Sequence, residues 1–257
     1  MVYELKGRTV LITGGTAGLG AELARQFAAA GCSLVLNHSS GSESSVGRAQ
    51  ALKAELEAAH ADVSVHVIRA DCSIVAENDR LVKETLELTG GKLDGVIANA
   101  GWTRFSDFND LSAPTEEDFD MCYAVNVKSP WALLRTAGPT LKANPDGGFF
   151  LMTSSTAGST ASGSALPYGV SKAANLHLMR CMATSQAPKI RVNAVKPGLM
   201  LTEWGMKFGR ERVDAMIQAS KLQRETTVQS AAAVYIMLAM NESITGQAMQ
   251  IDGGQFI

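Results

Sequence analysis

Short apolar runs rich in β-branched residues alternate with longer amphipathic segments along the whole chain. This alternation is typical of βαβ units, in which helices connect parallel strands of one sheet. We expect strands near residues 8–13, 33–37, 63–69, 93–98, 147–153, 190–195 and 246–251. Helices are expected near residues 18–30, 43–60, 75–89, 116–142, 167–185 and 226–240, with a shorter one near 209–220. The pattern predicts an α/β fold, with one doubly wound parallel sheet of about seven strands and helices on both faces.

Length and composition are sufficient for one domain. The 257 residues are 46% hydrophobic, and no linker, repeat or low-complexity tract divides them. Residues 1–257 are therefore expected to form a single domain with one sizeable core. Pro130 falls inside the 116–142 segment, and it should kink or split that helix because a mid-helix proline loses a hydrogen bond and clashes with the preceding turn.

Charge and cysteine usage exclude several classes of partner. The net charge is -2, and no run of Lys or Arg marks one face for a nucleic-acid backbone. No apolar run approaches the roughly 18 residues that span a bilayer, and the first residues lack a targeting pattern. The cysteines have no metal-ligand spacing and are expected to be buried as small apolar residues: Cys32, Cys72, Cys122 and Cys181. We expect a small-molecule substrate, no metal, no nucleic acid or membrane partner, and a cytoplasmic location.

The candidate chemistry lies between residues 152 and 172. Tyr168 follows Ser155 by thirteen residues, and Lys172 follows Tyr168 by four. If Pro167 opens a helix, Tyr168 and Lys172 share one helical face. A tyrosine that ionises near neutrality needs a pKa roughly 3 units below its ordinary value, or about 4 kcal/mol, and a nearby ammonium in a desolvated cleft would supply much of it. Ser155 would offer its hydroxyl to the oxygen that Tyr168 protonates. Tyr-x-x-x-Lys alone is also an ordinary surface pair.

A glycine cluster follows the first expected strand. Gly14, Gly18 and Gly20 would allow a tight turn and close backbone approach to a pyrophosphate at the start of the next helix. The spacing differs from Gly-x-Gly-x-x-Gly and from the P-loop, which requires Gly-Lys-Ser/Thr. A kinase of the P-loop class is therefore disfavoured.

The ordered set of motifs resembles the short-chain dehydrogenase/reductase family, over nearly the whole chain. The motifs are Thr13-Gly14-x-x-x-Gly18-x-Gly20, Asn99-Ala100-Gly101, Asn126, Ser155, Tyr168-x-x-x-Lys172, Pro197-Gly198 and Ile251-Asp252-Gly253-Gly254. The resemblance implies a Rossmann-like fold in which Tyr168 is the general acid or base and Ser155 orients the carbonyl or alcohol. It further implies that Lys172 binds the nicotinamide ribose and lowers the pKa of Tyr168. Asn126 would hold a water of a proton relay that leads through Lys172. Ser154 is less favoured than Ser155, which has the family's separation from Tyr168.

The resemblance also implies the cofactor contacts. They are Gly14, Thr16, Gly18, Leu19, Gly20, Asn37, His38, Ser39, Asp71, Cys72, Asn99, Ala100, Gly101, Tyr168, Lys172, Pro197, Gly198 and Thr202. Asp71 would bind the adenine amine, and Thr202 would reach the nicotinamide carboxamide. Many family members have a second Asn where this chain has Ala98, and we expect only a minor loss of hydrogen bonding there.

Residues 34–40 bear on the choice between NAD and NADP. An Asp or Glu there would accept the adenosine 2′-hydroxyl and repel a 2′-phosphate, and none is present. His38, Ser39 and Ser40 can all donate hydrogen bonds to a phosphate. NADP(H) is therefore favoured over NAD(H), although Ala17 stands where NADP-using relatives often place Arg, and His38 is only partly charged at neutral pH.

Three segments should line the substrate site: residues 102–112, 158–166 and 199–216. The third contains Met200, Leu201, Trp204, Met206, Phe208 and Met216. These side chains suit an apolar or aromatic substrate under a mobile lid, or several of them form the core face of the helix near 209–220. Arg104 and Lys207 are the basic candidates near the mouth, which favours a neutral ketone.

The leading hypothesis is an NADP(H)-dependent ketoreductase or alcohol dehydrogenase with Tyr168 as general acid/base. The alternatives are a catalytically silent dinucleotide-binding regulatory protein, or the same fold used for imine reduction, epimerisation or dehydration. The resemblance implies a homo-oligomer, either a tetramer or a dimer. The apolar residues of the 167–185 helix could lie in such an interface or face their own sheet: Leu176, Leu178, Met179 and Met182.

Overall fold

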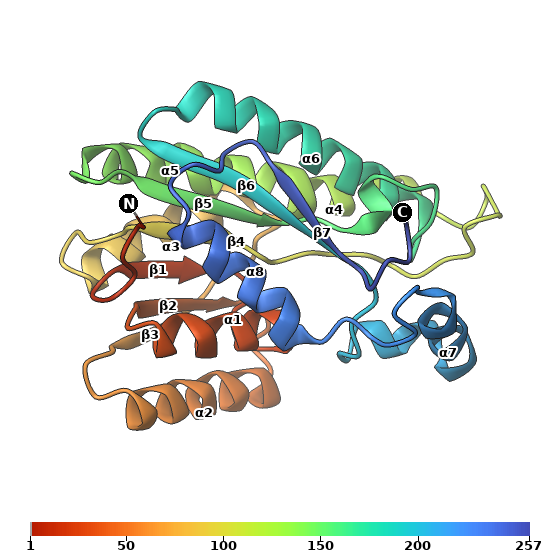
Figure 1. The fold of residues 1–257 in the computed structure, drawn as a ribbon, viewed down its shortest axis with the longest axis horizontal. Helices are drawn as coiled ribbons and strands as arrows, with labels where there is room; N and C mark the ends of the chain where they lie inside the picture. Colours follow the sequence, from red (N-terminus) through yellow and green to blue (C-terminus); the bar gives the residue numbers. More distant parts are fainter. Residues whose placement is uncertain (1) are drawn as a thin grey trace.

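The computed structural model describes residues 2–257, and in this part of the chain it contains one sheet of seven parallel strands (Figure 1). The strands are β1 (Thr9–Ile12), β2 (Ser33–His38), β3 (Val65–Arg69), β4 (Gly95–Ala98), β5 (Gly148–Thr153), β6 (Ile190–Pro197) and β7 (Ala248–Ile251). Their order in the sheet is β3-β2-β1-β4-β5-β6-β7. The predicted doubly wound parallel sheet is confirmed.

Helices cover both faces of the sheet. They are α1 (Gly18–Ala29), α2 (Glu43–Ala59), α3 (Val75–Leu88), α4 (Glu116–Tyr123), α5 (Ser129–Ala143), α6 (Leu166–Gln186), α7 (Arg210–Ala219) and α8 (Val228–Met240). Apolar side chains of α1, α2 and α8 pack on one face, and those of α3, α5 and α6 pack on the other. Figure 1 shows α2 and α6 at opposite sides of the molecule. Helix α7 lies apart from both layers, beside the carboxyl ends of the strands.

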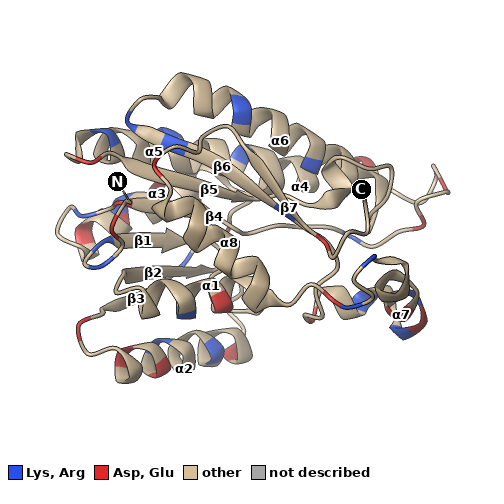
Figure 2. Cartoon of the chain, viewed as in Figure 1, with Lys and Arg blue, Asp and Glu red and all other residues tan. Residues whose placement is uncertain are grey.

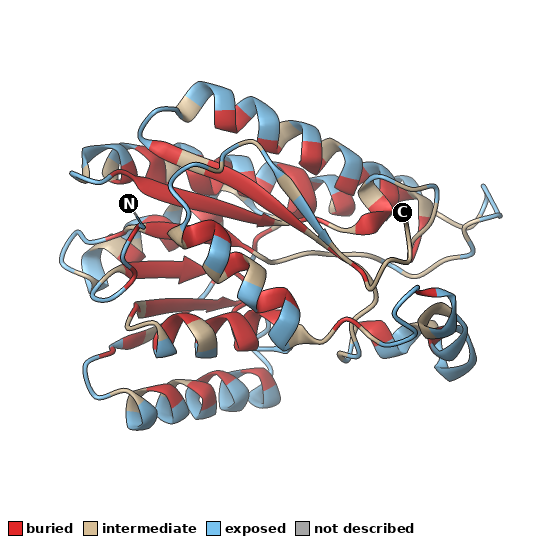
Figure 3. Ribbon diagram, viewed as in Figure 1, coloured by how far each residue is buried: buried red, intermediate tan, exposed pale blue. Residues whose placement is uncertain are grey.

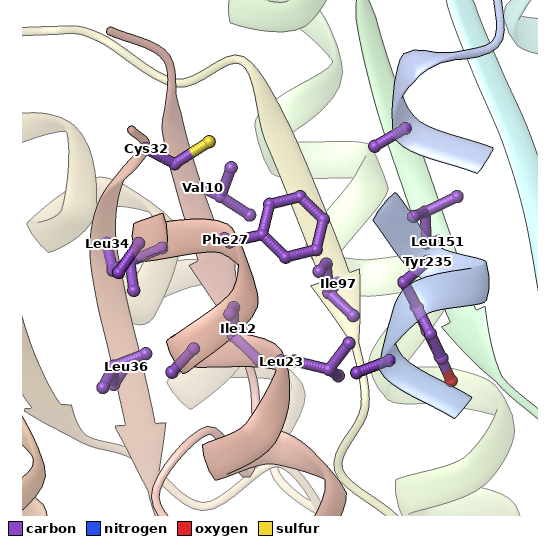
Figure 4. Close-up of a cluster of buried hydrophobic side chains, with 14 of the residues drawn as sticks. Val10, Ile12, Leu23, Phe27, Cys32, Leu34, Leu36, Ile97, Leu151 and Tyr235 are labelled. Carbon is purple, nitrogen blue, oxygen red and sulfur yellow. The ribbon is translucent and has the colours of Figure 1, made fainter. Parts of the chain in front are cut away.

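Strand side chains alternate between the two cores. Val10 and Ile12 of β1 belong to the core under α1 and α8, whereas Leu11 belongs to the core under α5 and α6. The two-residue period of a strand sends successive side chains to opposite faces, so strands buried on both faces read as unbroken apolar runs. In Figure 4, Phe27 of α1 lies between Val10 and Ile97. Figure 3 shows the buried strands at the centre and the exposed outer sides of the helices.

The expected kink or split of the 116–142 segment near Pro130 takes the form of a π-helical turn between two α-helices. Helix α4 passes into a π-helix at Ala124–Lys128, and α5 begins at Ser129 with Pro130 in its first turn. The residues before Pro130 are also helical, so its missing N–H leaves a carbonyl of the preceding turn without that donor, and the carbonyl of Asn126, four residues earlier, accepts from Asn175 at 2.8 Å instead. The π-helix, which the sequence did not reveal, carries Asn126.

Helix α6 packs its apolar side against the sheet and exposes the other side. Leu176, Met179 and Met182 are buried in the core against the sheet, so they face their own fold and not a subunit interface. The expectation that all four cysteines are buried is wrong for Cys181, which is exposed on α6. It stands two residues from Met179, on the outer side of the helix.

In the view of Figure 2, residues of both signs alternate along the helices and the loops that connect them. Within residues 2–257, no helix has the length and hydropathy to cross a membrane. The same residues contain no group of three or more His, Cys, Asp or Glu side chains that could hold a metal ion.

Tyr235 of α8 connects the core to the end of β5. Its ring is fully buried beside Leu151 (Figure 4), and its hydroxyl lies 2.7 Å from Oγ1 of Thr153. Because the Thr153 hydroxyl donates its one proton to Oδ1 of Asn99 at 3.1 Å, Tyr235 is the donor in this pair.

Tyr235→Phe should lower the free energy of unfolding by about 1 kcal/mol, since a buried threonine oxygen loses its donor without any change in volume. Chemical denaturation measures this loss. Tyr123→Phe is the matched control, because Tyr123 is 49% exposed and its substitution should change stability by less than about 0.5 kcal/mol. Equal effects of the two substitutions would show that the buried hydroxyl contributes nothing.

Candidate active site

The carboxyl ends of the strands open into one large cleft. Its volume is about 1160 Å³, and it is lined by the turn after β1, the ends of β4, β5 and β6, the first part of α6 and the segment from Leu199 to Phe208. The strand order reverses between β1 and β4, where crossover helices leave in opposite directions and open a crevice for ligands. The fold therefore creates the cleft that the motifs require.

The turn after β1 has a backbone conformation and close contacts that require glycine, as the turns of dinucleotide-binding sites do. Gly14 and Gly18 have φ of 58° and 51°, a region that side chains strongly disfavour. A Cβ on Gly20 would lie 1.9 Å from the carbonyl oxygen of Gly14, which is backbone and cannot move aside. Glycine at position 20 therefore lets the start of α1 pack directly against the turn, and the amino end of this helix is the kind of place where a pyrophosphate binds.

Asn99 fixes this turn to the strand that carries the chemistry. Its Nδ2 donates to the carbonyl oxygens of Thr13 and Gly14 at 3.0 and 3.2 Å, and its Oδ1 accepts from Thr153. Asn37 holds the turn from the other side, because its Oδ1 accepts the amide of Gly14 at 3.2 Å. The glycine turn and the end of β5 therefore form one connected unit.

Ser155, Tyr168 and Lys172 line the same wall of the cleft. Pro167 stands in the first turn of α6, as predicted, and Tyr168 and Lys172 follow on one side of the helix. Lys172 is 2% exposed, and its Nζ donates to the carbonyl of Thr153 at 2.7 Å and lies 5.5 Å from the centre of the Tyr168 ring. Ser154 donates instead to the backbone carbonyl of Lys172, which leaves Ser155 as the serine beside the phenol.

The pKa of Tyr168 shifts in the direction opposite to the one expected. Burial raises the pKa of Tyr168 to about 12, and the neighbouring Ser155 hydroxyl opposes this only in part. Burial lowers the pKa of Lys172 to about 8, because a desolvated ammonium is costly. The expected depression of the Tyr168 pKa is therefore wrong for this structure, in which burial raises the pKa and the hydrogen bond with Ser155, not the amine of Lys172, opposes it. Near pH 7 the phenol holds its proton, which suits a proton donor.

Asn126 lies behind this wall and does not line the cleft. Its Oδ1 accepts a hydrogen bond from the backbone N–H of Trp102 at 3.0 Å. Its Nδ2 donates to the backbone carbonyl of Trp102 at 3.0 Å and to the hydroxyl of Ser171 at 2.9 Å. Its backbone carbonyl accepts from Asn175 at 2.8 Å. Both Nδ2 protons are engaged, whereas Oδ1 and the backbone carbonyl oxygen each accept one hydrogen bond and each keep a second lone pair to which a relay water could donate.

Most of the residues expected to contact the cofactor do line the cleft. They are Gly14, Gly18, Leu19, Gly20, Asn37, Ser39, Asp71, Cys72, Asn99, Ala100, Gly101, Tyr168, Lys172, Pro197, Gly198 and Thr202. Thr16 and His38 are buried outside it. His38 points under the loop that follows β2, where its Nδ1 lies 2.9 Å from the carbonyl of Ser40, so the structure does not present it to a phosphate.

Sequence reasoning missed Arg48 of α2, which lines the cleft near Ser39 and Ser40. Its position ten residues beyond β2 carries no local signal, because only the docking of α2 brings it there. Thr153 was also missed as a partner of Lys172. The contact uses a backbone carbonyl, which any residue type could supply.

The substrate end of the cleft is largely apolar. Met200, Leu201, Trp204, Phe208 and Met216 line it, whereas Met206 does not. The buried residue of α7 is Val213, so the helix has little core face, and these side chains belong to the cleft. The Trp204 ring centre lies 6.0 Å from that of Tyr168.

The expectation that Arg104 lies at the mouth is wrong. Arg104 is paired with Asp118, which also caps α4 and whose pKa this pairing holds well below its usual range. The guanidinium groups that line the cleft belong to Arg48 and Arg212, and Lys207 lines it as expected.

Comparisons with known proteins agree with this geometry. A family model described as enoyl-(acyl carrier protein) reductase matches residues 14–255. A Streptomyces violaceoruber protein, named as a ketoacyl reductase of the granaticin polyketide synthase, is 33% identical over 246 residues, which cover 95% of this chain and 94% of that protein.

Solved structures show the same fold. A blue fluorescent protein from a metagenomic library, in complex with NADPH, matches with a TM-score of 0.89 and 27% identity over 99% of this chain and 100% of its own. A short-chain dehydrogenase from Burkholderia cenocepacia, in complex with NADP, matches with a TM-score of 0.87 and 29% identity over 98% and 99% of the two chains. With the catalytic wall and the glycine turn in place, these matches show that the chain belongs to the short-chain dehydrogenase/reductase family of oxidoreductases.

Proposed function

We propose that the protein uses NADPH to reduce a neutral, apolar or aromatic ketone to an alcohol, with Tyr168 as the proton donor. The observation that carries the proposal is the shared wall of Ser155, Tyr168 and Lys172 beside the glycine turn. Two solved relatives hold NADPH or NADP, and residues 34–40 contain no carboxylate that would repel a 2′-phosphate.

The residues of the cleft fit a nicotinamide dinucleotide. Gly18 and Gly20 leave the backbone open to a pyrophosphate, and Asp71, Ala100 and Thr202 line the rest of the path. When bound, the nicotinamide would supply the hydride for the carbonyl carbon. The carbonyl oxygen, which gains negative charge as the hydride arrives, would accept a hydrogen bond from Ser155 and the phenolic proton from Tyr168.

Lys172 would restore the proton of Tyr168. At pH 7 a pKa of about 8 leaves the ammonium protonated by about ten to one. The ammonium would also hydrogen-bond the nicotinamide ribose. Asn126 would support the relay through a carbonyl oxygen, because its backbone oxygen and its Oδ1 each accept one hydrogen bond and keep a lone pair for a water. The apolar wall around Trp204 and Phe208 would exclude water and favour substrates without charge.

We also propose a homo-oligomer, a dimer or tetramer, in the cytoplasm. Large apolar side chains are exposed on the α4, α5 and α6 surface, where a second subunit could cover them: Phe119, Trp131 and Val170. Light scattering of the purified protein tests the oligomeric state, and a monomer at micromolar concentration would contradict it.

Tyr168→Phe should lower kcat for ketone reduction by about 10² to 10⁴-fold, because the variant keeps the ring but lacks the transferred proton. Steady-state kinetics with NADPH and a panel of aromatic ketones measures the loss. The Kd of NADPH should change little, which separates a chemical defect from a binding defect. Tyr123→Phe is the matched control. Near-normal turnover by Tyr168→Phe would contradict the assignment.

The same panel separates the alternatives. Cofactor binding without turnover of any substrate would favour a regulatory protein, and product analysis would reveal imine reduction, epimerisation or dehydration. An α,β-unsaturated thioester belongs in the panel because the matched family model is named for enoyl reductases.

The rate of reduction should fall by about tenfold between pH 7 and pH 9. The pKa of Lys172 is lowered to about 8, so its proton is present below pH 8 and is lost as the pH rises through it, while Tyr168 stays protonated up to about pH 12. Measuring kcat at saturating NADPH isolates this step from cofactor binding. Lys172→Arg should flatten the profile, since an arginine keeps its proton. A wild-type rate that is constant to pH 10 would exclude Lys172 as the proton source.

A further inference from the structure

One ion pair joins two sides of the cofactor groove. Nη1 of Arg48 on α2 lies 3.2 Å from Oε1 of Glu203, in the segment that follows β6. Both residues line the cleft. We call residues 199–209 the lid segment. The Arg48–Glu203 ion pair connects this segment to α2.

The lid segment also comes close to the glycine turn. A Cβ on Gly18 would lie 3.4 Å from Cγ2 of Thr202, the residue before Glu203. The pair with Arg48 therefore links α2 to the part of the lid segment that borders the region expected to contain the pyrophosphate.

Arg48 is well placed to bind a phosphate as well. Ser39, Ser40 and Arg48 all line the cleft, and they belong to the loop and the helix that follow β2, at whose carboxyl end the adenosine ribose of a dinucleotide would lie. Arg69 adds positive charge beneath this loop, because its guanidinium packs against Gly41 and its Nε donates to the carbonyl of Ser39 at 3.4 Å. Arg69 does not line the cleft, so Arg48 is the guanidinium that a ligand there could reach.

The pair with Glu203 is easily exchanged. The side chains of Arg48 and Glu203 are 49% and 84% exposed, and ion pairs this accessible to water are weak. A phosphate dianion carries more charge than a carboxylate and offers a guanidinium two parallel hydrogen bonds. A 2′-phosphate at Ser39 and Ser40 would therefore compete successfully for Arg48 and would repel Glu203.

We propose that Arg48 and Glu203 form a latch that the adenosine 2′-phosphate opens. The phosphate takes the guanidinium away from Glu203, so that one arginine both selects NADP(H) and frees the lid segment. NAD(H), which has a neutral 2′-hydroxyl, leaves the pair intact. The inference rests on the proposed use of NADP(H).

The test is a double-mutant cycle on cofactor affinity. The Kd values of NADPH and NADH are measured by nucleotide fluorescence at one fixed salt concentration for the wild type, Arg48→Gln, Glu203→Gln and the double variant. Lys53→Gln on α2 and Glu211→Gln on α7 are charge-matched controls, because neither residue lines the cleft.

Arg48→Gln should weaken NADPH binding by about tenfold or more and leave the Kd of NADH within about twofold. Glu203→Gln should tighten NADPH binding by a few-fold, because the competing carboxylate is gone, and should not affect NADH. In the Arg48→Gln background, Glu203→Gln should lose its effect.

The outcomes separate the latch from the cofactor assignment. A wild type that binds NADH more tightly than NADPH would overturn the proposed cofactor and the latch together. A wild type that prefers NADPH, with the preference unchanged in Arg48→Gln, would overturn the latch alone. Equal weakening of both cofactors by Arg48→Gln, or weaker NADPH binding in Glu203→Gln, would also refute it.

Discussion

The site depends on a partly buried chain of hydrogen bonds at the carboxyl ends of β1, β4 and β5. Tyr235 donates to Thr153, Thr153 donates to Asn99, and Asn99 donates to the carbonyls of Thr13 and Gly14. A buried polar group without a partner costs roughly 1–3 kcal/mol, so each member fixes the next. The chain holds the glycine turn at a set distance from the strand whose last carbonyl binds Lys172. The binding half and the chemical half of the cleft are thereby one rigid unit.

Burial, more than any single charge, sets the protonation of the catalytic wall. The phenol of Tyr168 is kept neutral, and the pKa of the Lys172 ammonium is brought close to physiological pH. In the proposed reduction, Tyr168 would carry the proton that the substrate receives, and Lys172 would be the nearby group that replaces it. The same burial would oppose the reverse reaction, in which the phenol must first lose its proton. The two shifts are therefore consistent with the reduction proposed above.

The sequence predicted the regular parts of this structure well, because the apolar period of two or 3.6 residues reports directly on burial. It also placed Ser155, Tyr168 and Lys172, since their spacing reflects one strand end and one helix face. It failed where geometry depends on docking of distant elements. Arg48 reaches the cleft through the packing of α2. Arg104 is withdrawn from it by Asp118, and no local pattern indicates either fact. The direction of the Tyr168 pKa shift could not be predicted either, because it depends on how deeply the phenol is buried, and a sequence motif does not report burial.

The π-helix at Ala124–Lys128 amounts to one extra residue in an otherwise regular helix. The widened turn takes up this extra residue locally, and Asn126 lies within it, with its side chain bonded to Trp102 and Ser171. Deleting one residue between Ala124 and Lys128 would restore a regular helix and remove the widened turn from which Asn126 makes these bonds. The number of residues between Ala124 and Lys128 is therefore constrained more strictly than their identity. Natural variation here should consist of substitutions and not of insertions or deletions.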